Sequence, residues 1–387
     1  MYRSHTPTGR RRGHPQEGEI VLSTFHADAP GPGPCGAART AVATGPAPHR
    51  PQVLLAMHPS EVEDLFDADA LRRLADSTQV DPTRTLLDLG RPTAAGTLAE
   101  AEVLVTSWGS RRIDTSVLDS MPRLRLVVHA GGTIKPLIDG EAFARGVRVS
   151  SAAEANAVPV AEYTLASVIL AAKRAFTTAH RYRTGVRGVA GTHRDLSGLS
   201  RIGTYGLTVG VVGASRIGRR VVRLLRDVLD ADVLLYDPFG AEGLTDDPRV
   251  RLTGLDEVLR ESDVVSLHAP LTELSRGMID ARALALMRDG AVLVNTARGA
   301  LVDTDALVAE LVSGRLDAVL DVSDPEPLPR DSVLFTLPHV FITPHMAGAL
   351  GVEVLRLGCL AVDEVERYAA GLPLRYEVFP DQLDRLA

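Results

Sequence analysis

The chain has 387 residues, of which 45% are hydrophobic and 24% charged, and its formal net charge is −7. This length and aliphatic content fit two or three domains with buried cores and exclude a wholly disordered chain. The mild acidity argues against nucleic acid or an anionic membrane as the main partner, and two cysteines, Cys35 and Cys359, are too few for a disulfide scaffold or a four-cysteine zinc site.

Residues 1–50 differ from the rest of the chain. They are rich in Pro, Gly, Thr, Ala and Arg and have little apolar periodicity, which predicts a mostly disordered leader. No apolar segment follows the basic triplet at 10–12, so an export signal is not expected. No apolar run approaches the roughly 20 residues that span a bilayer. We therefore expect a cytoplasmic protein with no membrane partner.

From residue 53, short apolar runs alternate with segments of helical spacing. The runs at 53–57, 102–107, 124–130 and 147–151 are typical of buried strands. A long helix is expected over 158–174, with Asn156 as its cap and Pro159 in its first turn. This alternation predicts a parallel α/β sheet.

A second series of the same kind follows the long helix. Strands are expected at 208–213, 232–237, 264–270, 291–297, 316–322 and 340–345. Helices are expected at 217–229, 255–261, 281–288 and 303–313, and a final helix at about 350–370. The pattern predicts an α/β protein with two doubly wound parallel-sheet domains. One would comprise 51–156 and, if the final helix returns to it, 347–387; the other would comprise 157–346.

A glycine-rich turn joins the first strand and helix of the second series. Gly213 permits a tight turn and Gly218 permits close packing of helix on strand, while the helix N-terminus offers N–H groups to a pyrophosphate. Ser215 replaces the middle glycine of the usual dinucleotide-binding motif, and its side chain either crowds the phosphates or donates to them. Asp237 is nineteen residues beyond Gly218. It either accepts hydrogen bonds from ribose, which favours NAD over NADP, or is a turn residue before Pro238.

Three polar side chains stand just beyond later strands of this series. They are Arg298, Glu326 and His345. Open α/β sheets bind ligands at the carboxyl ends of their strands, so we expect these side chains to meet. Arginine clamps a carboxylate with two prongs, and a histidine oriented by a carboxylate is suited to proton transfer. Any one of them alone is a weak signal, and a histidine at a strand end is more often structural, but together they predict acid–base chemistry on an anionic substrate.

The motifs VGVVGASRIGR, SLHAPLT, LVNTARGALVD, LDVSDPEPLP and ITPHMAG follow one another along the chain. With the segment AEANAVPVAEYTLA before them, they resemble the D-isomer-specific 2-hydroxyacid dehydrogenase family from about residue 53 to about 378. The resemblance implies a flavodoxin-like substrate-binding domain at 51–156 and 347–387 and an NAD-binding Rossmann domain at 157–346. It also implies hydride transfer between NAD and a 2-oxo or D-2-hydroxy acid. Arg298 would orient the substrate, Glu326 would support the histidine, and His345 would transfer the proton.

The resemblance also assigns binding residues, and it implies no metal. The cofactor would contact Gly213, Ser215, Arg216, Ile217, Gly218, Asp237, His268, Ala269, Pro270, Thr296, Ala297, Arg298, Asp321, His345 and Gly348, with Asp321 near the nicotinamide amide. The substrate would contact Gly131, Gly132, Thr133, Lys135 and Arg298.

The loop at 129–136 lacks the acidic element usual in the family and has Lys135 instead. This lysine either binds a second anionic group of the substrate or points into solvent beside Pro136. The resemblance further implies a homodimer, with the apolar side chains of the long helix at 165–172 forming either an interface or core. A non-catalytic, NAD-sensing regulatory protein on the same fold is the alternative.

Overall fold

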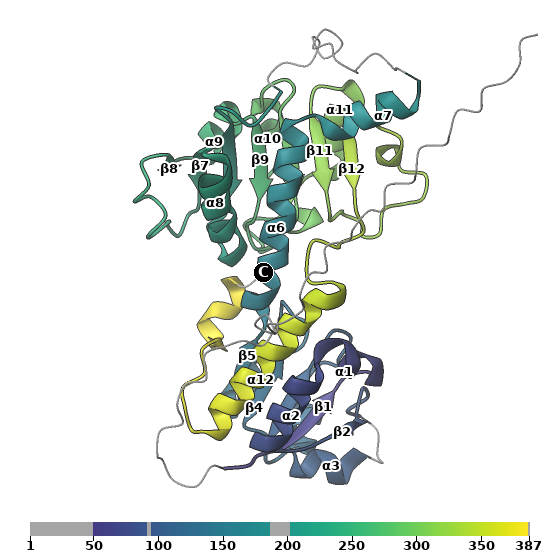
Figure 1. Cartoon of the computed structure of the whole chain (residues 1–387), viewed down its shortest axis with the longest axis vertical. Coiled ribbons are helices and arrows are strands. Elements are labelled where there is room, and N and C mark those ends of the chain that lie inside the picture. Colours follow the sequence, from purple (N-terminus) through teal and green to yellow (C-terminus); the bar gives the residue numbers. More distant parts are fainter. Residues whose placement is uncertain (1–48, 91–93, 186–201, 386–387) are drawn as a thin grey trace, which may run out of the picture.

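The computed structural model describes residues 49–90, 94–185 and 202–385. Residues 1–48, nearly all of the predicted leader at 1–50, lie outside these ranges. The described residues form two lobes, each built on one sheet (Figure 1). Both are doubly wound α/β structures, which confirms the predicted fold class.

The first lobe contains a six-stranded sheet. Its strands are β1 (Gln52–Ala56), β2 (Gln79–Thr85), β3 (Val103–Thr106), β4 (Leu126–His129), β5 (Arg148–Ser151) and β13 (Glu377–Val378). The spatial order is β13-β5-β4-β3-β1-β2, and all neighbours are parallel except the antiparallel pair of β13 and β5. The five parallel strands thus have the flavodoxin-like order 2-1-3-4-5. The sequence pattern missed β2, which is a polar edge strand, and β13, which has only two residues.

Helices cover both faces of this sheet. They are α1 (Pro59–Leu65), α2 (Ala68–Ser77), α3 (Ala95–Glu100), α4 (Thr115–Ser120), α5 (Gly140–Ala144) and α12 (Leu355–Ala369). One core, with Leu55, Leu74 and Leu357, joins the sheet to α1, α2 and α12. The other, with Leu98 and Leu104, joins it to α3, α4 and α5. The final helix therefore returns to the first sheet, although the exact domain bounds stay a prediction.

The second lobe contains a seven-stranded, fully parallel sheet. Its strands are β6 (Thr208–Val212), β7 (Asp232–Tyr236), β8 (Val250–Leu252), β9 (Val264–Leu267), β10 (Val292–Asn295), β11 (Asp317–Leu320) and β12 (Val340–Ile342). The order β12-β11-β10-β9-β6-β7-β8 reverses direction between β6 and β9. This reversal is the switch point at which doubly wound sheets bind their ligands.

The helices of the second lobe are α6 (Ala153–Ala172), α7 (Ala175–Arg183), α8 (Arg216–Leu229), α9 (Leu255–Glu261), α10 (Ala281–Leu286) and α11 (Thr304–Ser313). The core on one face joins α6 and α8 to the sheet, and the core on the other joins α9, α10 and α11 to it. Helices in both lobes begin at aspartates whose carboxylates accept backbone N–H bonds: Asp67, Asp114, Asp139, Asp280 and Asp303.

The long helix α6 begins earlier than the sequence indicates. Asn156 is not its cap and Pro159 lies in its interior, because the helix starts at Ala153. Val168 and Ala172 are buried in the core of their own lobe, so at these positions the apolar side chains form core. By length and composition alone α6 could cross a membrane, but 56% of its most apolar stretch is buried within the protein.

Candidate active site

The predicted histidine and glutamate meet beyond the carboxyl ends of β11 and β12. His345 Nδ1 lies 2.7 Å from Glu326 Oε1. The two side chains are 49% and 42% exposed, so a ligand can reach the free edge of the imidazole. His345 has a φ of 53°, a backbone conformation uncommon for a residue with a side chain.

Asp321 holds the backbone around His345 in this conformation. Its carboxylate accepts hydrogen bonds from Thr343 Oγ1 at 2.6 Å, from the Met346 amide at 2.8 Å and from the Ala347 amide at 2.9 Å. The Asp321 carbonyl accepts one more from the His345 amide at 2.8 Å. Asp321 is only 1% exposed. Its expected contact with a nicotinamide amide stays a prediction, but its structural role is clear: it shapes the loop that presents the histidine.

Arg298 follows β10 at the same edge of the sheet. The Asn295 side chain donates to the Arg298 carbonyl at 2.9 Å and accepts from the Ala297 amide at 3.1 Å, which fixes the turn. A Cβ atom on Gly299 would lie 2.0 Å from the Ser323 carbonyl carbon, so glycine permits this loop to approach the one that carries Glu326. Burial lowers the pKa of Arg298, and the Glu326 carboxylate opposes that shift.

The turn between β6 and α8 has the shape that a dinucleotide pyrophosphate requires. Gly213 has a φ of 103°, and a Cβ atom there would lie 2.6 Å from the Ala269 amide nitrogen. A Cβ atom on Gly218 would lie 2.0 Å from the Gly213 carbonyl oxygen. Ser215 caps α8, since its hydroxyl accepts from the Gly218 amide at 3.3 Å. The residues present therefore fit the cofactor, with the hydroxyl of Ser215 turned toward the helix.

Asp237, at the end of β7, is tied to the same turn. Its carboxylate accepts from the Ala214 amide at 2.6 Å and from the Phe239 amide at 2.8 Å. The side chain therefore stabilises a turn, as one interpretation of the sequence expected, and it also lies beside the glycine-rich turn, where the other interpretation places the ribose. Its contact with ribose stays a prediction.

Several expected cofactor residues direct their side chains into the protein. His268 is 3% exposed, its Nε2 lies 2.8 Å from Ser266 Oγ, and burial lowers its pKa to about 3. Thr296 Oγ1 is 2.9 Å from Thr164 Oγ1 on α6. Ile217 packs against the core of the lobe. The side chains of His268 and Thr296 are therefore engaged within the protein, and the cofactor contacts expected at these positions and at Ala269, Pro270 and Ala297 stay predictions.

The glycine loop of the first lobe lies against a histidine that the sequence analysis missed. His129, at the end of β4, is 4% exposed, and burial lowers its pKa to about 4. Its Nδ1 lies 3.0 Å from Thr106 Oγ1. A Cβ atom on Gly131 would lie 2.3 Å from its Nε2. Its position at a strand end was the available signal, but an isolated histidine in an apolar run is usually structural.

Asn156 joins the glycine loop to the segment that follows His345. Its side-chain oxygen accepts from the Ala349 amide at 2.9 Å. Cβ atoms on Gly132 and Gly348 would each lie 3.1 Å from the Asn156 amide group. The predicted substrate loop and the end of the predicted cofactor segment are thus neighbours. Thr133 Oγ1 accepts from the amide of the half-buried Lys135 at 3.4 Å.

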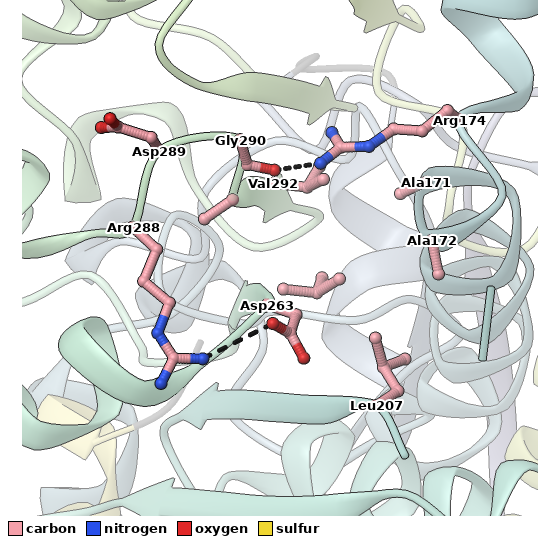
Figure 2. Close-up of a pocket in the computed structure, with 11 residues that line it drawn as sticks. Ala171, Ala172, Arg174, Leu207, Asp263, Arg288, Asp289, Gly290 and Val292 are labelled. Carbon is pink, nitrogen blue, oxygen red and sulfur yellow. Dashed lines mark hydrogen bonds and ion pairs between the residues drawn. The ribbon is translucent and has the colours of Figure 1, made fainter. Parts of the chain in front are cut away.

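A cavity of about 200 Å³ lies away from these residues, at the amino ends of β6, β9 and β10 (Figure 2). Arg174 donates to the Gly290 carbonyl in its wall, and Arg288 lies 3.5 Å from Asp263. This cavity is therefore separate from the edge that holds His345, because ligands of doubly wound sheets bind at the carboxyl ends of strands. Among the described residues, no group of three or more His, Cys, Asp or Glu side chains could hold a metal ion.

Comparison with known proteins gives consistent findings. Residues 165–347 match the family model of the D-isomer specific 2-hydroxyacid dehydrogenase NAD binding domain. The chain is 34% identical over 294 residues to (S)-sulfolactate dehydrogenase of Chromohalobacter salexigens, covering 76% of this chain and 90% of that one. It is 33% identical over 328 residues to D-3-phosphoglycerate dehydrogenase of Mycobacterium leprae, covering 84% and 58%. It spans about half the length of the curated D-3-phosphoglycerate dehydrogenases that it matches.

Solved structures share the fold. The D-lactate dehydrogenase of Aquifex aeolicus, complexed with NAD and lactic acid, superposes with a TM-score of 0.61 at 27% identity, over 82% of this chain and 95% of that one. The similarity thus extends over both lobes.

Proposed function

Since the chain belongs to the D-isomer-specific 2-hydroxyacid dehydrogenase family, we propose that it interconverts a 2-oxo acid and the corresponding D-2-hydroxy acid, with NAD as its cofactor. The observation that carries the proposal is the 2.7 Å contact of His345 with Glu326 at the sheet edge that also holds Arg298. When bound, NAD supplies or accepts the hydride at the α-carbon.

In the reducing direction, the exposed imidazole of His345 donates a proton to the developing alkoxide. Glu326 holds Nδ1, which leaves Nε2 to face the substrate and stabilises the positive charge of the imidazolium. Arg298 offers a fixed fork of N–H donors to the substrate carboxylate, and its partial burial strengthens that interaction. The Gly131–Gly132 backbone would hold the carboxylate from the other lobe.

The substrate class follows from the charges near the loop. Lys135 would add a point charge to the guanidinium of Arg298, which suits a 2-oxo acid with a second anionic group. Among relatives, the names sulfolactate dehydrogenase and phosphoglycerate dehydrogenase both denote substrates with such a group. If Lys135 serves this role, Lys135→Met should raise KM for a dianionic 2-oxo acid by about tenfold and leave a monoanionic analogue nearly unchanged. Equal effects on both would remove Lys135 from the site.

The test of the proposed reaction is direct. NADH absorbance is followed after the protein and NADH are mixed with each of a panel of 2-oxo acids. The panel includes phosphonate and sugar-acid analogues. Turnover of at least one acid is expected, at a rate about tenfold or more higher with NADH than with NADPH because Asp237 repels a 2′-phosphate. Binding of NADH without turnover of any acid would instead support the non-catalytic, NAD-sensing alternative.

The assembly and location are further proposals. A homodimer formed through the cofactor lobe agrees with the exposure of Leu170 on α6, which is 43% exposed. Light scattering should give a mass near twice the 41.3 kDa of one chain. A mass near that of one chain would contradict it. The acidic composition agrees with a cytoplasmic enzyme that acts on small molecules.

A further inference from the structure

Glu154 of α6 contacts two arginines of α8, Arg216 and Arg220. Glu154 lies in the first turn of α6, which packs beside α8 (Figure 1). Its Oε2 lies 3.0 Å from Arg216 Nε, and its Oε1 accepts from Arg220 Nη2. Arg216 and Arg220 are four residues apart, so they share one face of α8. One carboxylate therefore binds two guanidinium groups across the two helices.

This cluster lies at the N-terminal end of α8, the end that would face the pyrophosphate of a bound dinucleotide. Arg216 is the first residue of the helix and follows Ser215, the residue that caps it. The free N–H groups and the dipole of this end favour an anion, and a nearby guanidinium would add to that attraction. Glu154 weakens this attraction for an anion, because its contact with Arg216 keeps a negative charge near the N-terminus of α8.

Arg220 gives an independent sign that Glu154 determines where these side chains lie. Its Nε is buried and has no hydrogen-bond partner in the part of the chain that the structure describes. A buried donor without a partner has an unfavourable free energy, so the side chain has not adopted the conformation that best satisfies its own donors. The contact of its Nη2 with Glu154 holds it there.

We infer that Glu154 is a positioning residue for the cofactor: it binds Arg216 and Arg220, withholds their charge from the pyrophosphate, and so limits the affinity for the dinucleotide. The physical reason is Coulombic. A carboxylate beside the phosphate-binding end repels the diphosphate and also neutralises a guanidinium that would otherwise attract it.

The experiment measures binding without any substrate, so its outcome does not depend on the proposed reaction. ADP-ribose, which contains the pyrophosphate, and adenosine, which has no phosphate, are titrated calorimetrically into the natural protein and Glu154→Gln. At about 20 mM salt, Glu154→Gln should lower the Kd for ADP-ribose by about three- to tenfold and leave the Kd for adenosine unchanged. At about 0.5 M salt the gain should shrink, because screening weakens the charge effect.

A matched control removes another carboxylate from an arginine of α8. Asp247 lies 2.7 Å from Arg226, which is in the last turn of the helix. That turn is about 15 Å along the axis from Arg216. Asp247→Asn should therefore leave the Kd for ADP-ribose within about twofold of the natural value.

Arg216→Gln tests the route of the effect. In the Arg216→Gln background, Glu154→Gln should lower the Kd for ADP-ribose by less than it does in the natural protein, because the two residues act together. Should Glu154→Gln not fold, Glu154→Ser also removes the carboxylate and suits the first turn of a helix. An unchanged or higher Kd for ADP-ribose in a folded Glu154 variant, or an equal gain for adenosine, would overturn the inference.

Discussion

Each lobe has a glycine-rich turn beside a buried, neutral histidine, which is His268 in the cofactor lobe and His129 in the other. The glycines of the two turns pack against different kinds of atoms. In the cofactor lobe, Gly213 and Gly218 approach backbone atoms, namely the Ala269 amide and the Gly213 carbonyl. In the other lobe, Gly131 approaches the ring of His129, which is a side chain. Backbone atoms of a packed sheet cannot move aside, whereas a side chain can.

This difference has a functional consequence. The cofactor turn must take one shape because the pyrophosphate is the same for every substrate of such a protein. The loop of the first lobe is shaped by side chains, and these can differ without altering the sheet. We therefore expect the chemistry at the edge that holds His345 and the selection of substrate at the edge that holds His129.

The largest expected effect tests that assignment. His345→Ala should lower kcat by about 10²–10⁴ and leave the affinity for NADH close to natural, because it removes only the proton donor. Glu326→Gln should lower kcat less, since it leaves the imidazole in place but removes the charge that stabilises the imidazolium. Both are measured by steady-state kinetics where chemistry limits turnover. A His345 variant with nearly full kcat would show that the proton comes from elsewhere.

The next prediction concerns the turn of the cofactor lobe, whose glycines pack against backbone atoms. Gly213→Ala should raise the Kd for NADH by about 30-fold or more, because the methyl group would meet the Ala269 amide and because the φ of 103° disfavours a side chain. Fluorescence titration with NADH measures the affinity, and thermal unfolding shows whether the fold survives. A Kd within about twofold of the natural value would mean that the backbone at this turn can move.

The corresponding change in the other lobe should be milder. Gly131→Ala should raise KM for the 2-oxo acid by about tenfold, since the His129 ring must shift to admit the methyl group, and should leave the Kd for NADH unchanged. Kinetics and NADH titration on the same preparation distinguish the two effects. Weaker NADH binding in this variant would contradict the separation of roles between the turns.

The smallest expected effect is on stability and comes from the protonation of the buried His129. Burial lowers the pKa of His129 to about 4, below its value near 6.5 in the unfolded chain. The unfolded state therefore binds the proton more tightly, so this contribution to stability is complete above pH 6.5 and is lost as the pH falls toward 4. The free energy of unfolding should fall by about 1.4 kcal/mol per pH unit within that window for this group.

His129→Gln should remove that slope in urea unfolding measured at pH 6 and pH 5. Equal slopes in the natural protein and His129→Gln would show that folding does not lower the pKa of His129.

The meeting of His345 and Glu326 at one sheet edge was predictable from the sequence because its signals are local. A buried apolar run followed by Arg298, Glu326 or His345 places each residue at the end of a strand, and parallel strands bring those ends together. The glycine spacing from Gly213 to Gly218 likewise reports a turn with one required backbone shape. The start of α6 was not predictable in the same way. Asn156 resembles a cap in sequence, but its side chain bonds to the Ala349 amide from a distant part of the chain.

The sequence by itself determined most of the alternation of strands and helices, the order of the candidate catalytic residues and the family, since each depends on neighbours along the chain. The tertiary structure alone decided how residues far apart in sequence use their polar groups. It turned the carboxylate of Asp321 toward the loop of His345, placed His129 behind Gly131, and joined Glu154 to Arg216. Such partners depend on burial and on the packing of distant segments, and no local pattern records them.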